Sequence, residues 1–185
     1  SYAINYIHRF PGKYIVEFET DIVVNASPSK VLYLKPIHGL VKVEFKGRGH
    51  KIHVYNFFKS KPSGCTLDKI IIRVNAMIPA NRKSVVKVNN LNIIIDTNET
   101  DGYTSFISPI NIVAPKIILE NITINGKILG GDFYDNLAAI YTFGGENVLI
   151  NITVNVYTTV PSSPYDFNTC FFIDSPKTVY MKNII

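Results

Sequence analysis

Apolar and polar residues alternate through most of the second half of the chain, and the alternation recurs at a fixed interval. When the sequence is written in rows of 31, apolar side chains fall into two columns two positions apart. The columns are Val86, Ile117, Val148, Val179 and Val88, Leu119, Ile150, Met181. A period of two predicts β-strands with one buried face. Strands that return at a constant interval indicate a solenoid, in which each turn packs against the next.

The segments between these strands are rich in Gly, Pro and Asn, and none shows convincing helical periodicity. Ankyrin and leucine-rich repeats need a helical half, so the pattern predicts an all-β chain, a single-stranded right-handed parallel β-helix. The register is clear from about residue 84 onward, with a slip of one residue near Asn151. Residues 1–60 fit the period poorly, so we expect an N-terminal β cap and attachment region there. We expect residues 61–185 to form the β-helix and the β-helix to continue beyond the C-terminus.

The repeated segments resemble the pectin-lyase-like β-helix superfamily. The matching pattern is an apolar strand, a turn with Gly, Ser or Asn, and the motif V-x-I-x-N-I-x-I, which segments 141–154 and 172–185 follow loosely. The resemblance covers roughly residues 84–185, and it implies a fold shared by polysaccharide lyases, hydrolases, viral tailspikes and adhesins. Hydrolases of the superfamily carry N-x-D and D-D motifs, which this sequence lacks. The lyases' catalytic Arg or Lys has no counterpart beside the acidic residues.

Composition supports a folded strand-rich protein. Apolar residues make up 46% of the 185 residues and charged residues 18%, which argues against a disordered chain. The uncharged stretch 147–165 alternates and contains Pro161, so we expect a strand and a loop and no membrane span. Cys65 and Cys170 are interpreted as two free buried thiols rather than a disulfide. Of four N-x-S/T triplets, we favour glycosylation only at Asn98 and interpret Asn121 and Asn151 as structural residues.

Charge is distributed unevenly along the chain, whose net charge is +5. Residues 42–87 contain eleven Lys and Arg against two acids, whereas residues 96–174 contain two Lys against nine acids. The basic half predicts docking to a partner subunit, although solvated outer strand faces explain the same pattern. The docking candidates are Lys42, Lys46, Arg48, Lys51, Arg82 and Lys83. No helix-turn-helix, RNA-binding strand motif or zinc module is present, so we expect no specific nucleic-acid recognition.

The same repeat interval also aligns acidic and aromatic residues in the loops. The candidate ligand-binding residues are Asp101, Tyr103, Asp132, Tyr134, Asp135, Tyr165 and Asp166. Tyrosine rings stacked beside carboxylates about 5 Å apart are suited to binding sugars. Structural stacking, a glycan or receptor site, catalysis by a carboxylate pair and metal binding are all compatible with these columns. His50 and His53 point to opposite faces of a strand, so we expect no metal and no cofactor.

These observations favour a structural or attachment protein, a β-helical segment of a viral tail fibre, spike or cell-surface adhesin that recognises a host or glycan. We expect it on the virion surface or outside the cell, as a homo-oligomer in contact with other structural subunits and with surface glycans or a receptor. The alternative is a polysaccharide lyase or glycoside hydrolase of the pectin-lyase-like class. The sequence assigns no catalytic residue, so this interpretation leans away from an enzyme.

Overall fold

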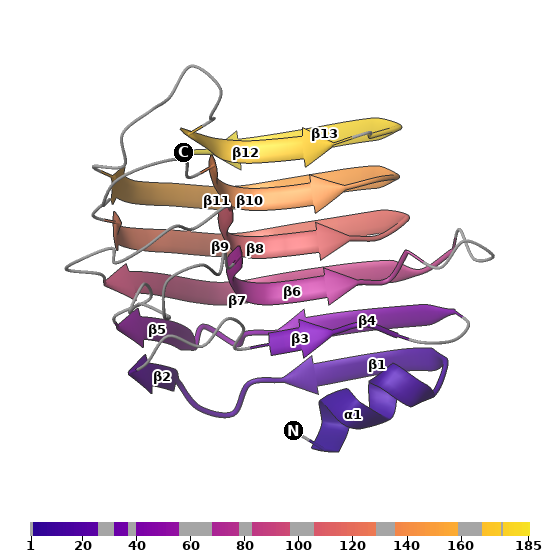
Figure 1. Ribbon diagram of the computed structural model, residues 1–185. Coiled ribbons are helices and arrows are strands. Elements are labelled where there is room, and N and C mark those ends of the chain that lie inside the picture. The colour runs from indigo at the N-terminus through magenta and orange to yellow at the C-terminus, as the bar shows by residue number, and fades with distance from the viewer. Residues whose placement is uncertain are drawn as a thin grey trace, which may run out of the picture.

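The chain, seen in a computed structural model, is a parallel β-solenoid of about 4 turns (Figure 1). The structure describes residues 2–25, 32–36, 40–55, 68–77, 83–96, 106–128, 136–158, 168–174 and 176–185. Within these ranges every strand pair is parallel. The prediction of an all-β parallel solenoid is therefore confirmed.

The described residues form one helix followed by thirteen strands. They are α1 (Tyr2–Arg9), β1 (Gly12–Glu17), β2 (Ile22–Asn25), β3 (Leu32–Leu34), β4 (Val41–Lys46), β5 (Lys51–Tyr55), β6 (Asp68–Asn75), β7 (Val85–Asp96), β8 (Phe106–Val113), β9 (Lys116–Ile128), β10 (Asn136–Phe143), β11 (Glu146–Thr158), β12 (Asn168–Asp174) and β13 (Thr178–Ile184). The sequence analysis found no helical segment, and this prediction was wrong for residues 2–9, which form α1. Helix α1 buries Ile7 and packs Ile4 against the core, and so covers one end of the solenoid.

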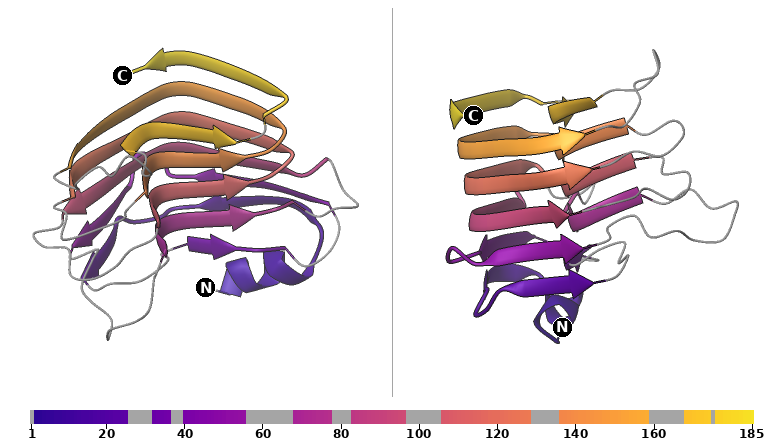
Figure 2. Two further views of the ribbon diagram at one scale, coloured as in Figure 1. Left: turned by 45° about the horizontal axis from the view of Figure 1, so that its top comes forward. Right: turned by 90° about the vertical axis from the view of Figure 1, so that its left-hand side faces the viewer.

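Two sheets enclose the core. The first sheet has eight strands, with β1, β4, β7, β9, β11 and β13 in that order and with β2 and β5 pairing beside the second half of β7. The second sheet has five strands in the order β12, β10, β8, β6 and β3. Figure 2 shows the long strands of the first sheet arching over the core while the second sheet closes the opposite side.

A single asparagine in the left-handed backbone region bends each of the four later strands of the first sheet. These residues are Asn90, Asn121, Asn151 and Asn183, with φ angles of 51°, 53°, 54° and 52°. Asparagine tolerates this conformation better than other side chains do. The bend also shifts the alternation by one position, so that Val88 before Asn90 and Leu91 after it both point inward.

The same asparagines form a ladder of side-chain hydrogen bonds. Asn121 Nδ2 donates to Asn90 Oδ1 at 3.0 Å, and Asn151 Nδ2 donates to Asn121 Oδ1 at 2.8 Å. Asn183 Nδ2 donates in turn to Asn151 Oδ1 at 2.8 Å. The interpretation of Asn121 and Asn151 as structural residues is thus confirmed.

The repeat is less regular than the constant interval predicted from the sequence. Successive members of the asparagine ladder are 31, 30 and 32 positions apart along the chain. The buried column has the same unequal steps, since Val88 pairs with Leu119, Leu119 with Leu149, and Leu149 with Met181. The predicted columns were therefore wrong at β11, whereas Val179 and Met181 of β13 lie in them as predicted. Val148 and Ile150 lie on the outer face of the first sheet, and the buried positions are occupied by Asn147 and Leu149 instead.

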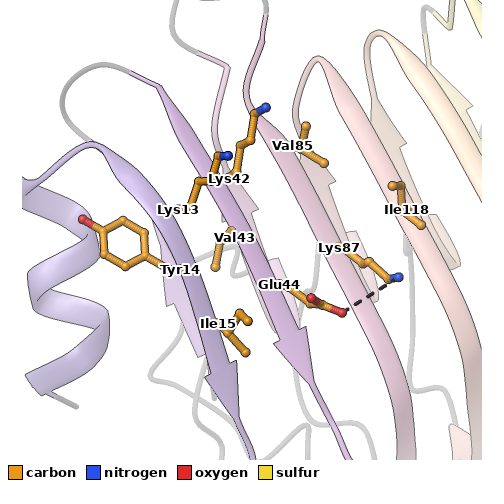
Figure 3. A pocket seen from close by; sticks show the side chains of 9 residues that line it. All are labelled: Lys13, Tyr14, Ile15, Lys42, Val43, Glu44, Val85, Lys87 and Ile118. Carbon is orange, nitrogen blue, oxygen red and sulfur yellow. Dashed lines mark ion pairs between the residues drawn. The ribbon is translucent and has the colours of Figure 1, made fainter.

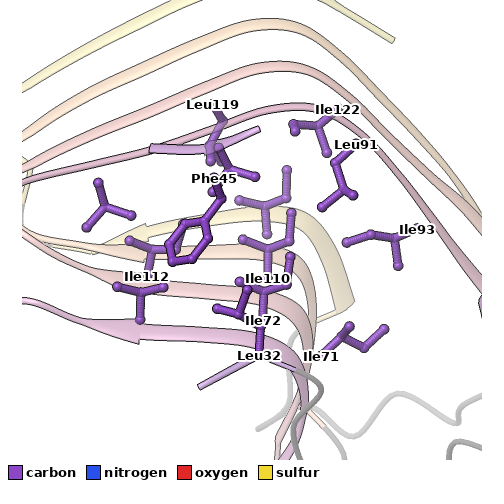
Figure 4. Close-up of a cluster of buried hydrophobic side chains, with 14 of the residues drawn as sticks. Leu32, Phe45, Ile71, Ile72, Leu91, Ile93, Ile110, Ile112, Leu119 and Ile122 are labelled. Carbon is purple, nitrogen blue, oxygen red and sulfur yellow. The ribbon is translucent and has the colours of Figure 1, made fainter. Parts of the chain in front are cut away.

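The core is a continuous apolar stack between the two sheets. Phe45, Leu91 and Leu119 of the first sheet face Ile72 and Ile110 of the second, and each is at most 1% exposed (Figure 4). Aliphatic side chains of neighbouring turns pack directly on one another, because parallel strands stack like residues about 4.8 Å apart. This packing makes the outer faces of the sheets firm supports for a binding site.

The N-terminal region 1–60 contributes strands to the same sheets. Strand β1 pairs with β4, where Gly12 lies beside Val41, and β4 pairs with β7, where Lys42 lies beside Val85. The number of residues between paired positions is much larger from β4 to β7 than from β1 to β4. The poor fit of this region to the period therefore reflects unequal spacing along the chain. Its attachment role stays a prediction. No helix within the described residues is long and apolar enough to cross a membrane.

Candidate ligand-binding face

The predicted Asp and Tyr columns fall in parts of the chain that the structure does not describe. The residues concerned are Asp101, Tyr103, Asp132, Tyr134, Asp135, Tyr165 and Asp166. Three further predictions also lie outside the described residues: docking by Arg82, glycosylation at Asn98 and the thiol of Cys65. The proposed stacking of the three tyrosines therefore stays a prediction. Cys170 is a free thiol but is exposed, so the expectation of a buried thiol is wrong for this residue.

The described docking candidates, Lys42, Lys46, Arg48, Lys51 and Lys83, do not form one free cationic patch. Lys46 Nζ lies 3.6 Å from Glu17 Oε1, and an Arg48 guanidinium nitrogen lies 3.5 Å from Glu17 Oε2. Lys51 begins β5, on the far side of the corner at residues 47–50, and Lys83 is exposed just before β7. Lys42 lies on β4 and points outward, where the structure places it beside a residue that sequence analysis did not select, Lys13.

A depression of about 370 Å³ lies on the outer face of the first sheet, where Lys13 and Lys42 meet (Figure 3). Strands β1, β4, β7 and β9 form it. Its lining residues are Lys13, Tyr14, Ile15, Lys42, Val43, Glu44, Val85, Lys87 and Ile118. Most of the exposed lining is apolar, so the depression is a shallow apolar floor with charged groups at its rim.

The alternation of the strands explains why these side chains point outward. Tyr14 and Val43 pack toward the core, so their neighbours Lys13 and Lys42 must point away from it. Parallel register then aligns outward residues across the sheet, with Lys13 beside Lys42 and Lys42 beside Val85. Two positions further along each strand, the same rule aligns the next outward row. That row is Ile15, Glu44, Lys87 and Ile118.

Ion pairs fix the charges at one rim of the depression. Lys87 Nζ lies 2.9 Å from Glu120 Oε2 and 3.8 Å from Glu44 Oε1. Asn89 Nδ2 also donates to Glu44 Oε1 at 2.6 Å. The side chain of Lys87 is 29% exposed and that of Glu44 is 28% exposed, so the network is accessible to solvent and to a ligand. It holds a carboxylate and an ammonium group in fixed positions beside the apolar floor.

The outer face of the second sheet has a different character. The rings of Tyr141 and Phe172 lie parallel on adjacent strands, with centroids 5.5 Å apart and planes inclined by 7°. The Tyr141 hydroxyl donates to Asp174 Oδ2 at 3.4 Å, and burial, aided by the nearby Asp174 carboxylate, raises the pKa of Tyr141. In this stack one face of each ring is covered by the other ring, so the pair reinforces the contact between β10 and β12.

The described histidines His50 and His53 have other partners than a metal site. His50 Nδ1 lies 3.1 Å from Asp21 Oδ1, and the Lys51 backbone N–H together with His50 lowers the pKa of Asp21. His53 stacks on Tyr55 with ring centroids 3.9 Å apart, away from that contact. Among the residues that the structure describes, no group of three or more His, Cys, Asp or Glu is close enough to hold a metal ion.

Comparison of the chain with protein-family models, curated proteins and solved structures yields no match. Its function is therefore argued from the depression and the solenoid that supports it.

Proposed function

We propose that the protein is a structural attachment module, a rigid β-solenoid that displays a glycan-binding surface. The observation that carries the proposal is the depression on the outer face of the first sheet, with its apolar floor and charged rim. In this proposal the chain is similar in role to the solenoid segments of viral tailspikes and surface adhesins of the pectin-lyase-like superfamily. It acts on the virion surface or outside the cell, as part of a homo-oligomer.

The support of the depression favours attachment. Four hydrogen-bonded strands hold its lining residues, and the side chains beneath them belong to the continuous core. Sites built on strands keep their geometry better than sites built on loops. The asparagine ladder further ties β7, β9, β11 and β13 together. A module of this kind can bear a load along its axis while its outer face stays in a fixed shape.

The lining chemistry favours a sugar. Ile15, Val85 and Ile118 offer an apolar surface on which the C–H face of a sugar ring can lie. Glu44 accepts and Lys87 donates hydrogen bonds, so the rim can satisfy ring hydroxyl groups. A mostly apolar surface with a few fixed polar groups is typical of small-ligand sites, whose volumes run from about 300 to 1,000 Å³.

The proposal is tested by glycan binding with two matched variants. Ile118 and Val148 are partners on neighbouring strands, and both point outward, but only Ile118 lines the depression. We expect the 185-residue chain to retain glycans on an immobilised glycan panel. Ile118→Ser should weaken retention about tenfold, because a largely covered aliphatic side chain contributes about 1.5 kcal/mol or more. Val148→Ser should leave retention unchanged.

Two outcomes would contradict this assignment. If the folded chain retains no glycan, or if Ile118→Ser and Val148→Ser behave alike, the depression is not a glycan site. Release of reducing ends or unsaturated products from a retained polysaccharide would instead favour the alternative, a polysaccharide lyase or glycoside hydrolase.

A further inference from the structure

We propose that the depression selects a sugar that carries a carboxylate group, and that Lys13 and Lys42 bind this carboxylate. This inference rests on the proposed glycan-binding function and adds the chemical class of the ligand.

The two lysines are placed to act on one anion. Lys13 and Lys42 are register partners on adjacent parallel strands, β1 and β4. Their Cα atoms are therefore separated by about 4.8 Å, the spacing between neighbouring strands. Figure 3 shows that both side chains extend in the same direction along one rim of the depression. Two ammonium groups so arranged can each donate to one oxygen of a single carboxylate.

No carboxylate of the described residues pairs with these lysines. Glu44, the nearest carboxylate of the lining, is engaged by Lys87 and Asn89. Glu17 on β1 is engaged by Lys46 and Arg48. Within the described part of the chain, neither Lys13 nor Lys42 takes part in an ion pair. Two uncompensated positive charges at one rim produce a local field that attracts an anion.

The rest of the depression favours a carboxylated sugar over a free phosphate. The backbone amides of the inner strands β4 and β7 are committed to strand pairing on both sides, so these two strands offer no cluster of free N–H groups. The lining also contains no arginine, the residue best suited to a phosphate because of its planar fork. It offers two point charges beside the apolar surface of Ile15, Val85 and Ile118. A ring with an apolar face and one carboxylate uses both features.

Calorimetric titration of the 185-residue chain with two matched disaccharides tests the inference. One ends in glucuronic acid, and the other ends in glucose, which carries a hydroxymethyl group in place of the carboxylate. We expect the acidic disaccharide to bind about tenfold more tightly at low salt, as two exposed ion pairs allow. Raising the ionic strength should remove most of this preference, because salt screens exposed charges.

Paired lysine variants supply the control. The double variant Lys13→Gln, Lys42→Gln should bind both disaccharides equally, with the affinity that the unmodified chain has for the neutral one. Lys116→Gln should keep the preference, because Lys116 lies in the same outward row but pairs with Glu146 at 3.2 Å and does not line the depression. Circular dichroism melts confirm that each variant is folded.

The outcomes separate this inference from the proposed function. Equal binding of both disaccharides by the unmodified chain, or a preference that survives in the double variant, overturns the inference. In that case, weaker binding by Ile118→Ser still supports a neutral glycan site. Inorganic phosphate that competes as strongly as the acidic disaccharide also overturns the carboxylate assignment. If the folded chain binds neither disaccharide and retains no glycan on the panel, both proposals fail.

Discussion

The solenoid changes direction at two kinds of corner. One kind is stabilised by hydrogen bonds of the backbone and the other by hydrogen bonds of a side chain. Between β10 and β11 the corner is Gly144-Gly145, with φ angles of 92° and 53°. Its contacts are made by the backbone: Gly144 N–H donates to Asp174 O at 2.9 Å, and Lys177 N–H donates to Gly145 O at 2.8 Å. Within the first sheet the corner is one asparagine, whose side chain is bonded to the equivalent asparagine of the next turn.

The difference shows two solutions to one geometric requirement. Both corners need a backbone in the left-handed region, which glycine and asparagine reach at low cost. At the glycine corner the preceding turn approaches so closely that no side chain fits, since a Cβ on Gly145 would overlap the carbonyl oxygen of Pro115. At the asparagine corner the side chain itself connects the turns. In both cases stability comes from contacts between neighbouring turns, as expected for a solenoid.

The largest expected effect follows from the close approach at the glycine corner. Gly145→Ala should lower the free energy of unfolding by at least about 4 kcal/mol, because it combines a disfavoured φ with a backbone collision that two paired strands oppose. Chemical denaturation monitored by circular dichroism measures this loss.

Gly49→Ala is the control for the backbone angle alone. Gly49 has a φ of 79°, yet nothing lies within 4 Å of the position that a Cβ would occupy. Its cost should be about 1 kcal/mol, the conformational penalty alone. Equal losses for the two alanine variants would show that the glycine corner depends on conformation and not on close packing.

A smaller effect is expected at the asparagine corner. Asn121 is an inner member of the ladder and both donates and accepts a side-chain hydrogen bond. Asn121→Ala should cost about 2 kcal/mol, through the left-handed backbone and two exposed hydrogen bonds. Asn121→Gly restores the backbone preference and should cost about 1 kcal/mol. Thermal melts of both variants separate the two contributions.

The end of the ladder provides the comparison for this prediction. Asn183 donates one hydrogen bond of the ladder, to Asn151, and has a similar φ of 52°. Asn183→Ala should therefore cost less than Asn121→Ala. If the two alanine variants are equally destabilised, the ladder adds nothing beyond the backbone preference of each asparagine.

The sequence was sufficient to predict the solenoid but not its register. Alternation identified the strands because each has one face in the core. The number of residues from one turn to the next depends instead on the length of each corner. The alternation of apolar and polar residues carries no information about that length. Only Gly144 and Gly145 separate β10 from β11, whereas the corner between β12 and β13 is one position longer, and the paired strands absorb the difference. The 30-residue step from β9 to β11 moved the true columns one position away from the predicted ones at β11, and the 32-residue step through this longer corner brought β13 back to them.

The depression was only partly predictable for a related reason. Lys42 was selected from charge alone, whereas Lys13, Ile15 and Ile118 were not selected. Alternation in 13–17 and 41–46 could have assigned outward positions to these segments, but the unequal steps from β1 to β4 and from β4 to β7 hid which of them are neighbours. Helix α1 was missed because so short a helix contains too few turns for a helical period to stand out.

The smallest expected effect concerns a buried polar group without a hydrogen-bond partner beside the glycine corner, whereas the buried Asn89 beside the asparagine corner is hydrogen-bonded to Glu44. Thr142 is fully buried two residues before Gly144, and its hydroxyl has no hydrogen-bond partner in the described structure. Thr142→Val keeps the shape of the side chain and removes the cost of that unpaired group, so it should raise the free energy of unfolding by about 1 kcal/mol. In contrast, the Thr169 hydroxyl donates to Phe171 O at 3.0 Å, so Thr169→Val should lower stability slightly. Denaturation midpoints that fall in both variants would show that Thr142 is satisfied by a bound water, and that the glycine corner is as well paired as the asparagine corner.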